Sequence, residues 1–184
     1  MPEMLEVAIA AAREAGARQR EGLRQPIEVL EVRRHDIKLA MDVACEDAIR
    51  RRIAEAFPDH AVLGEEAGGA VSPDAPTWII DPLDGTVNYL YGFPSWAVSV
   101  GVLIDDRPAV GVVHAPALAT VWRGVADDFA EANGRPIRCG GATEVSAALV
   151  ATGFGYDPAV RAVQGVQVAA LLPQIRDIRR AGAA

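Results

Sequence analysis

Two acidic residues, Asp81 and Asp84, lie three positions apart, directly after the apolar run Trp-Ile-Ile. Such a run is typical of a buried strand. Gly85 and Thr86 follow the second carboxylate. Carboxylates at this spacing suit a hard cation, and the Gly-Thr step offers main-chain amides and a hydroxyl to an anion. A cation site beside an anion site is the minimum set of groups for phosphoryl transfer.

A third carboxylate, Glu65, stands two residues after the short apolar segment 61–63. If the two strands are neighbours, Glu65, Asp81 and Asp84 meet in one small volume. Three unpaired carboxylates would repel one another and one would take up a proton, so a divalent cation would stabilise the group. Oxygen donors without His or Cys favour Mg²⁺ over zinc. The alternative, exposed turn residues, does not explain why both groups of acids follow apolar strands.

Asp42 stands where a helix is expected to begin, and two interpretations of it remain open. Asp is a favoured helix N-cap, and a carboxylate there could equally serve catalysis. Thr86 could cap the next turn. A Thr hydroxyl that is bonded to a carboxylate could instead accept a proton from an activated water. Arg179 and Arg180 could reach a phosphate, although paired charges are usually exposed.

Composition narrows the classes of protein. Half of the 184 residues are hydrophobic (51%), which argues against disorder, and the net charge of 18 − 25 = −7 argues against a nucleic-acid partner. A phosphate site must therefore obtain its positive charge from metal. Cys45 and Cys139 are isolated, which predicts two buried thiols and neither a disulfide framework nor zinc. The scattered histidines receive no role: His35, His60 and His114. Without a signal peptide or membrane-length apolar run, we expect a soluble cytoplasmic protein.

The pattern of elements predicts an α+β layered fold. Apolar residues recur at helical spacing in three segments: 3–22, 43–57 and 158–172. Strand character appears at 27–32, 61–63, 77–80, 96–104, 109–114, 120–124, 147–152 and 175–179. Residues 36–42 form an entry to the second helix, and 105–108 a hairpin turn. A change near 143 suggests a metal- and phosphate-binding domain at 1–143 and the incomplete start of an α/β domain at 144–184.

Several segments of the sequence resemble the inositol monophosphatase family, and together they cover essentially the whole chain. The resemblance rests on Gly64-Glu65-Glu66, on Asp81-Pro-Leu-Asp84-Gly-Thr86-Val-Asn88-Tyr, on Phe93-Pro94, on Asn133-Gly, and on Asp177-Ile-Arg-Arg-Ala-Gly182-Ala-Ala. It implies an αβαβα sugar-phosphatase fold, Mg²⁺-dependent and lithium-sensitive hydrolysis of a phosphate monoester, and a homodimer. The implied partner is a small phosphorylated polyol, most like inositol 1-phosphate. Fructose 1,6-bisphosphate, histidinol phosphate and 3′-phosphoadenosine 5′-phosphate are alternatives.

The resemblance also implies residue roles. Glu65, Asp81 and the Leu83 carbonyl would hold a first Mg²⁺, and Asp81 with Asp84 a second. Thr86, paired with Asp42, would help activate water. The residues that it places at the substrate are Leu83, Asp84, Gly85, Thr86, Gly182, Ala183 and Ala184, and those that it assigns to catalysis are Asp42, Glu65 and Thr86. The amides of Gly85 and Thr86 would bind phosphate, and residues 182–184 would form a helix N-terminus facing the substrate.

The sequence departs from the family pattern in two places, and the first bears on whether the chain is catalytic. The family continues past Gly-Ala-Ala with a helix, an acidic residue and a Trp-Asp segment that completes the second metal site, whereas this sequence stops at Ala184. Residues 126–132 also replace a Gly-rich turn. The chain is therefore expected to be C-terminally truncated, or else a non-catalytic remnant with a binding role. Apolar surface over 147–172 should be exposed unless a partner covers it.

Overall fold

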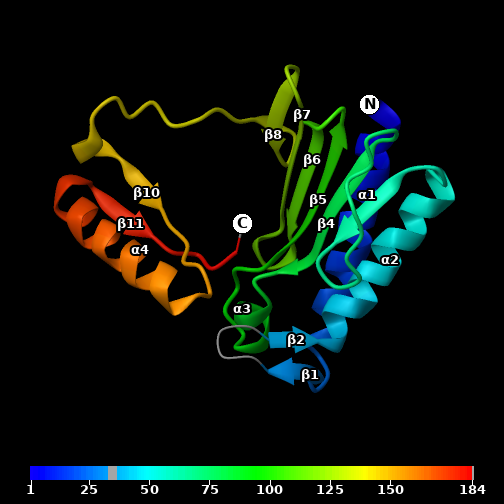
Figure 1. The fold of residues 1–184 in the computed structure, drawn as a ribbon, viewed down its shortest axis with the longest axis horizontal. Coiled ribbons are helices and arrows are strands. Elements are labelled where there is room, and N and C mark those ends of the chain that lie inside the picture. Colours follow the sequence, from blue (N-terminus) through cyan, green and yellow to red (C-terminus); the bar gives the residue numbers. More distant parts are fainter. Residues whose placement is uncertain (33–36, 184) are drawn as a thin grey trace.

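The computed structural model describes residues 1–32 and 37–183 and has the α+β organisation that the sequence predicts (Figure 1). Its helices are α1 (Pro2–Gly22), α2 (Ala40–Ala56), α3 (Thr86–Leu90) and α4 (Pro158–Leu171), with short 3₁₀ turns at Pro116–Leu118, Val145–Ala147 and Leu172–Gln174. Its strands are β1 (Val29–Val32), β2 (Ile37–Leu39), β3 (Ala61–Gly64), β4 (Thr77–Asp84), β5 (Ala97–Ile104), β6 (Arg107–Ala115), β7 (Thr120–Val125), β8 (Phe129–Ala132), β9 (Arg135–Pro136), β10 (Leu149–Ala151) and β11 (Asp177–Arg179).

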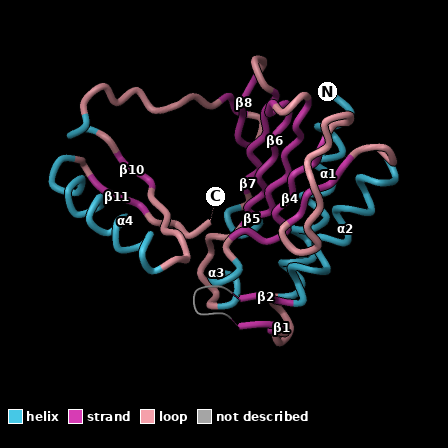
Figure 2. Tube along the Cα trace, in the orientation of Figure 1, coloured by secondary structure: helices cyan, strands magenta, loops and turns pink. Residues whose placement is uncertain are grey.

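One seven-stranded sheet forms the centre of the fold, with its strands in chain order from β3 to β9 (Figure 2). The β3–β4 pair is parallel and every other pair in this sheet is antiparallel. The predicted hairpin turn at 105–108 is shorter in the structure and consists of Asp105 and Asp106. Their φ angles of 51° and 58° are typical of a two-residue hairpin loop. Strands β8 and β9 were missed by the sequence analysis, because their short segments carry no clear alternation.

Helices α1 and α2 pack against each other, and together they cover one face of the sheet (Figure 1). Helix α1 turns a stripe rich in alanine toward β5 and β6, and small side chains let a helix approach a sheet closely. The buried members of that stripe are Leu5, Ala8, Ile9, Ala11, Ala12, Ala15, Gly16 and Gln19. Because the amphipathic period of 3–22 is strong, this helix was predicted almost to its ends.

The second helix begins earlier than the sequence suggested. It starts at Ala40 rather than near residue 43, and the expected entry segment contains strand β2, which pairs with β1. The first residue of that segment, Asp36, lies outside the described residues, as do His35 and Ala184. The cysteine prediction was half wrong, because Cys45 is buried but Cys139 is exposed.

Residues beyond the main sheet form a separate βαβ arrangement, in which β10 and β11 pair in parallel and α4 joins them (Figure 1). None of the residues of α4 is buried. Val163 and Val166 are 59% and 71% exposed, which confirms the expected apolar surface. The proposed domain boundary near 143 falls in the long segment before β10 and stays a prediction. No helix within the described residues is long and apolar enough to cross a membrane.

Candidate active site

The register of the sheet places two of the predicted acids side by side. Strand β3 runs parallel to β4 with Gly64 opposite Ile80, so Glu65 leaves β3 at the level of Asp81. The two carboxyl groups are in hydrogen-bond contact. The meeting of these two acids was predicted on the condition that the two strands were neighbours, and β3 and β4 pair directly.

A bulge in β4 turns the second acid toward the same place. Asp81 pairs with Ser99 and Asp84 with Ala97, so β4 advances three residues while β5 advances two. Pro82 has no amide hydrogen to lose from the ladder, which suits it to a bulge. The Leu83 amide donates to Asp81 Oδ1 at 3.1 Å and thereby closes the bulge on itself.

Helix α1 holds this bulge from behind through a residue that the sequence analysis missed. Gln19 is fully buried, and its Nε2 donates to the Pro82 carbonyl oxygen at 2.7 Å. Its own carbonyl accepts a hydrogen bond from the Tyr89 hydroxyl at 2.7 Å. Gln19 therefore holds the bulge at Pro82 with its side chain and the following helix at Tyr89 with its main chain. A polar residue on the otherwise apolar stripe of 3–22 was the available signal.

A cavity of about 490 Å³ opens over the bulge. Its wall contains seven of the predicted site residues: Glu65, Asp81, Leu83, Asp84, Gly85, Thr86 and Gly182. Residues without a predicted role also line it, among them Asn88, Tyr91, Tyr156 and Arg161. Arg180, which the sequence suggested as a phosphate contact, is on the wall too, whereas Arg179 binds Asp177 Oδ2 at 2.6 Å. The volume suits a small organic ligand.

The acids in this cavity shift one another's protonation. Burial raises the pKa of Asp81, and the charges of Glu65 and Asp84 and the contact with Glu65 raise it further, to about 8. Within residues 1–32 and 37–183, no group of three or more His, Cys, Asp or Glu side chains is arranged to hold a metal ion. The three carboxylates therefore line one cavity, but they are not close enough together to form a set of metal ligands. Their metal-binding role stays a prediction.

Thr86 and Asp42 form the predicted pair. Thr86 Oγ1 lies 3.0 Å from Asp42 Oδ1 and 2.9 Å from the Leu83 carbonyl oxygen, so its single proton can be donated to either acceptor. Asp42 is 2% exposed. Burial raises its pKa to about 6 although the hydrogen bonds from the Leu39 amide and Thr86 oppose the rise.

The simple capping interpretations of these two residues are wrong. The N-cap of α2 is Leu39, and Asp42 lies three residues into the helix, where its Oδ2 accepts the Leu39 amide at 2.9 Å. The N-cap of α3 is Gly85, and Thr86 is the first helical residue. Asp42 thus stabilises the start of α2 with one oxygen and leaves the other for Thr86.

Position 85 requires glycine, both for its backbone conformation and for the space that its neighbours leave. Its φ of 87° is left-handed, and a Cβ built there would lie 2.9 Å from the Cβ of Ala183 and 2.9 Å from the Ser95 carbonyl oxygen. Asn88 Nδ2 donates to the Ala181 carbonyl oxygen at 2.9 Å and to that of Ser95 at 2.6 Å. Residues 181–183 therefore lie against the motif. Ala184 is outside the described part of the chain, and the helix N-terminus that the resemblance implied at 182–184 stays a prediction.

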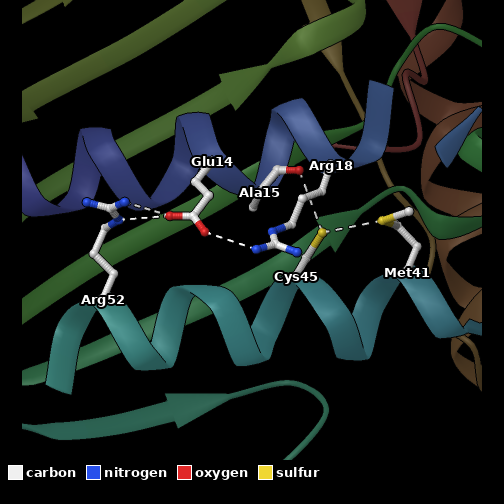
Figure 3. A network of polar contacts seen from close by, with 6 residues as sticks. All are labelled: Glu14, Ala15, Arg18, Met41, Cys45 and Arg52. Atoms are coloured by element: carbon white, nitrogen blue, oxygen red, sulfur yellow. Dashed lines mark hydrogen bonds and ion pairs between the residues drawn. The ribbon is translucent and has the colours of Figure 1, made fainter. Parts of the chain in front are cut away.

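The pair of helices behind the site is joined by charges and by a thiol (Figure 3). Glu14 on α1 accepts hydrogen bonds from Arg52 on α2 at 2.7 and 3.0 Å, and from Arg18 at 3.2 Å. Cys45 Sγ lies 3.6 Å from the Ala15 carbonyl oxygen. Burial raises the pKa of this thiol to about 12, so Cys45 is a packing residue and not a nucleophile.

The remaining candidates lie away from the cavity. Trp78 Nε1 donates to His60 Nδ1 at 3.0 Å, and His114 Nδ1 lies 3.0 Å from the Ala12 carbonyl oxygen. Both histidines thus bind residues of the core, and neither lines the cavity. Lys38 forms an ion pair with Glu66, the residue after Glu65.

The chain is similar to known proteins over its whole length. The family model for the inositol monophosphatase family matches residues 1–184. The chain is 37% identical to inositol monophosphatase 3 of Solanum lycopersicum, over 98% of this chain and 69% of that protein. It is 39% identical to inositol-1-monophosphatase of Mycobacterium bovis, over 78% of this chain and 53% of that protein.

A solved structure gives the same result for the fold. The crystal structure of the extragenic suppressor protein suhB from Bartonella henselae superposes with a TM-score of 0.91 at 25% identity, covering 98% of this chain and 71% of that one. The chain thus spans between about half and about 70% of the length of these relatives. On the motif, the fold and these similarities, the chain belongs to the inositol monophosphatase family of phosphatases.

Proposed function

We propose that this cavity hydrolyses a phosphate monoester, with inositol 1-phosphate as the preferred substrate. The observation that carries the proposal is the Thr86–Asp42 hydrogen bond on the wall that also holds Glu65, Asp81 and Asp84. A hydroxyl in contact with a buried carboxylate, beside clustered acids, is the arrangement that water activation needs. Names of relatives such as inositol-1-monophosphatase support the choice of substrate.

The donor set fits a divalent cation. Glu65, Asp81, Asp84 and the Leu83 carbonyl are all oxygen donors on one cavity wall. Burial first, and the charges of Glu65 and Asp84 next, raise the pKa of Asp81 to about 8, so the acids repel one another when all are ionised. A hard cation that keeps several waters would remove that repulsion, and Mg²⁺ is such a cation. When bound, it would polarise the phosphoryl oxygens and make water more acidic.

The chain's own residues supply the proton path. When Thr86 donates to Asp42 Oδ1, the lone pairs of its hydroxyl oxygen are free to accept a hydrogen bond from a water in the cavity. As that water attacks phosphorus and the bond to the ester oxygen breaks, its proton passes through Thr86 to Asp42. The ester oxygen leaves as an alkoxide and takes a proton from another water in the cavity, which gives the free alcohol. Asp42, with a pKa of about 6, is largely ionised at neutral pH and can receive the proton.

The substrate would be held by groups around the bulge. The amides of Gly85 and Thr86 would bind the phosphate, and Asp84 and Gly182 would face the polyol. Arg180 would add positive charge at the same wall. Fructose 1,6-bisphosphate, histidinol phosphate and 3′-phosphoadenosine 5′-phosphate remain the alternative substrates. We extend the proposal to inhibition by lithium, to a homodimer and to a cytoplasmic location.

Phosphate release from inositol 1-phosphate, measured with and without Mg²⁺, tests the proposal. We expect Mg²⁺-dependent release from the chain and none from the Asp81→Asn variant. Thr86→Ser should retain activity because it keeps a hydroxyl, whereas Thr86→Val should not. Release by the wild type that does not exceed that of Asp81→Asn would refute the activity of this chain and favour a non-catalytic binding role.

A further inference from the structure

We propose that Glu46 is a positioning residue for Glu65, and that helix α2 thereby fixes both halves of the site relative to each other. The inference rests on the proposed function only in taking Glu65 as a cation ligand. Glu46 is not among the described residues that line the cavity. It acts through the main chain of the turn that carries Glu65.

Glu46 binds the turn that follows strand β3. Its Oε2 accepts the Glu66 amide at 2.7 Å, and its Oε1 accepts the Ala67 amide at 3.0 Å. Glu46 is 1% exposed. A buried carboxylate that accepts two consecutive main-chain amides makes short, charge-assisted bonds with little freedom. The two residues after Glu65 are therefore fixed to α2.

Arg50 closes the same turn from the other side. Its Nε donates to Glu46 Oε1 at 2.7 Å, and its terminal nitrogens donate to the carbonyl oxygens of Val62 at 3.3 Å and Gly68 at 2.5 Å. One guanidinium thus joins the strand before Glu65 to the loop after it, and it also neutralises the buried charge of Glu46. A buried charge is tolerated only when it is paired in this way.

The residue before Glu65 is shaped to admit Glu46. A Cβ built on Gly64 would lie 2.4 Å from Glu46 Oε1 and 2.7 Å from Oε2, so only glycine leaves room for the carboxylate. The Gly64 amide also donates to the Gly68 carbonyl oxygen at 3.0 Å. With Gly64 held on one side and Glu66 on the other, the main chain of Glu65 has little freedom.

The same helix holds the other half of the site one turn earlier. Asp42 and Glu46 are four residues apart on α2, which places them on one face of the helix. Asp42 binds Thr86 at 3.0 Å, and Glu46 binds the turn that carries Glu65. Because a packed helix is rigid, the spacing between these two carboxylates sets the separation of Thr86 from Glu65.

Cation affinity tests this role. Mn²⁺, whose free concentration is read by electron paramagnetic resonance, replaces Mg²⁺ as the probe. We expect Glu46→Gln to weaken Mn²⁺ binding by about 10- to 100-fold, the range found when a group that orients a ligand is lost. The Gln side chain has one oxygen, so its NH₂ would face one of the two amide hydrogens. Glu46→Asp should also weaken binding, because it keeps the charge but not the reach.

Glu14→Gln is the matched control. It removes a carboxylate from another guanidinium network between the same two helices, formed with Arg52 and Arg18 (Figure 3). Its Mn²⁺ affinity should remain within about threefold of wild type, below the loss expected for an orienting group. Amide exchange should accelerate at Glu66 and Ala67 in Glu46→Gln and not in Glu14→Gln. In catalysis, Glu46→Gln should raise the Mg²⁺ requirement and leave the KM for substrate unchanged.

The outcomes separate this inference from the proposed function. Wild-type Mn²⁺ affinity in a folded Glu46→Gln variant, or equal weakening in Glu14→Gln, would overturn the role of Glu46 and leave the proposed function standing. No Mn²⁺ binding by the wild-type chain, or undiminished binding by Glu65→Gln, would overturn both. If Glu46→Gln does not fold, Glu46→Asp and Arg50→Lys carry the test, and wild-type affinity in both would overturn the role.

Discussion

Gly64→Ala is expected to destabilise the protein, against the ordinary preference for alanine in a strand. Glycine within a strand is unfavourable by roughly 0.5–1 kcal/mol relative to alanine, so the substitution alone should stabilise β3. At Gly64 the added Cβ would lie 2.4 Å from Glu46 Oε1, closer than real Cβ contacts. The Glu46 carboxylate cannot swing away freely, because Arg50 and two amides hold it.

The magnitude follows from these opposing terms. Overpacking a core typically costs about 1–3 kcal/mol. Displacing Glu46 weakens two amide bonds to a charged group, each worth about 1.5–3 kcal/mol. After the alanine gain is subtracted, and with the two penalties partly shared, we expect a net loss of about 2–4 kcal/mol. For a chain of this size that lowers Tm by roughly 4–16 °C.

Gly111→Ala supplies the control for this measurement. Gly111 lies inside strand β6, and its built Cβ meets nothing within 4 Å, so the same substitution should be neutral or stabilising there. Urea unfolding followed by circular dichroism compares the two variants. A Gly64→Ala variant as stable as Gly111→Ala would show that Glu46 is not held as the structure indicates.

Three further expectations concern the helix pair, a histidine and the catalytic hydroxyl. Gly16→Ala should destabilise by about 1–2 kcal/mol in thermal unfolding although alanine favours helices, because its Cβ would lie 2.5 Å from His114 Nδ1. Burial lowers the pKa of His60, and its Nδ1 accepts a hydrogen bond from Trp78. The stability that the neutral ring contributes is therefore complete above pH 6.5 and is lost as pH falls through the lowered pKa, so His60→Gln should flatten the dependence of unfolding free energy on pH below 6.5. Thr86→Val should lower kcat by about 100-fold or more, the usual contribution of a proton-transfer group, and a smaller loss in a steady-state phosphate assay would exclude Thr86 from the proton path.

Local sequence was sufficient for most elements and for the motif. Segment 3–22 was recognised as a helix and segment 96–104 as a strand from their patterns of apolar residues. Such a pattern shows which side of an element is buried, and it can be read from neighbouring residues alone. The acids after apolar strands were found for the same reason, since a strand that ends in Asp or Glu ends at a site or at the surface. The resemblance to one family followed from residues 64–66 and 81–89.

Contacts between distant residues decided the rest. The parallel register of β3 on β4 brings Glu65 beside Asp81, and the bulge in β4 turns Asp84 toward the same cavity. Gln19 and Glu46 were missed, because a polar residue on a helix is usually solvated. Their signal was a polar position within an otherwise apolar stripe.

What the sequence determined by itself is the chemistry: oxygen donors, a hydroxyl and a glycine that admits a close approach. What only the tertiary structure decided is how those groups are held. Helix α2 reaches Thr86 with one carboxylate and the turn of Glu65 with the next. The physical reason is that composition and spacing fix which side chains exist and on which face they lie. Their separation in space depends on sheet register and helix packing, which join residues far apart in the chain.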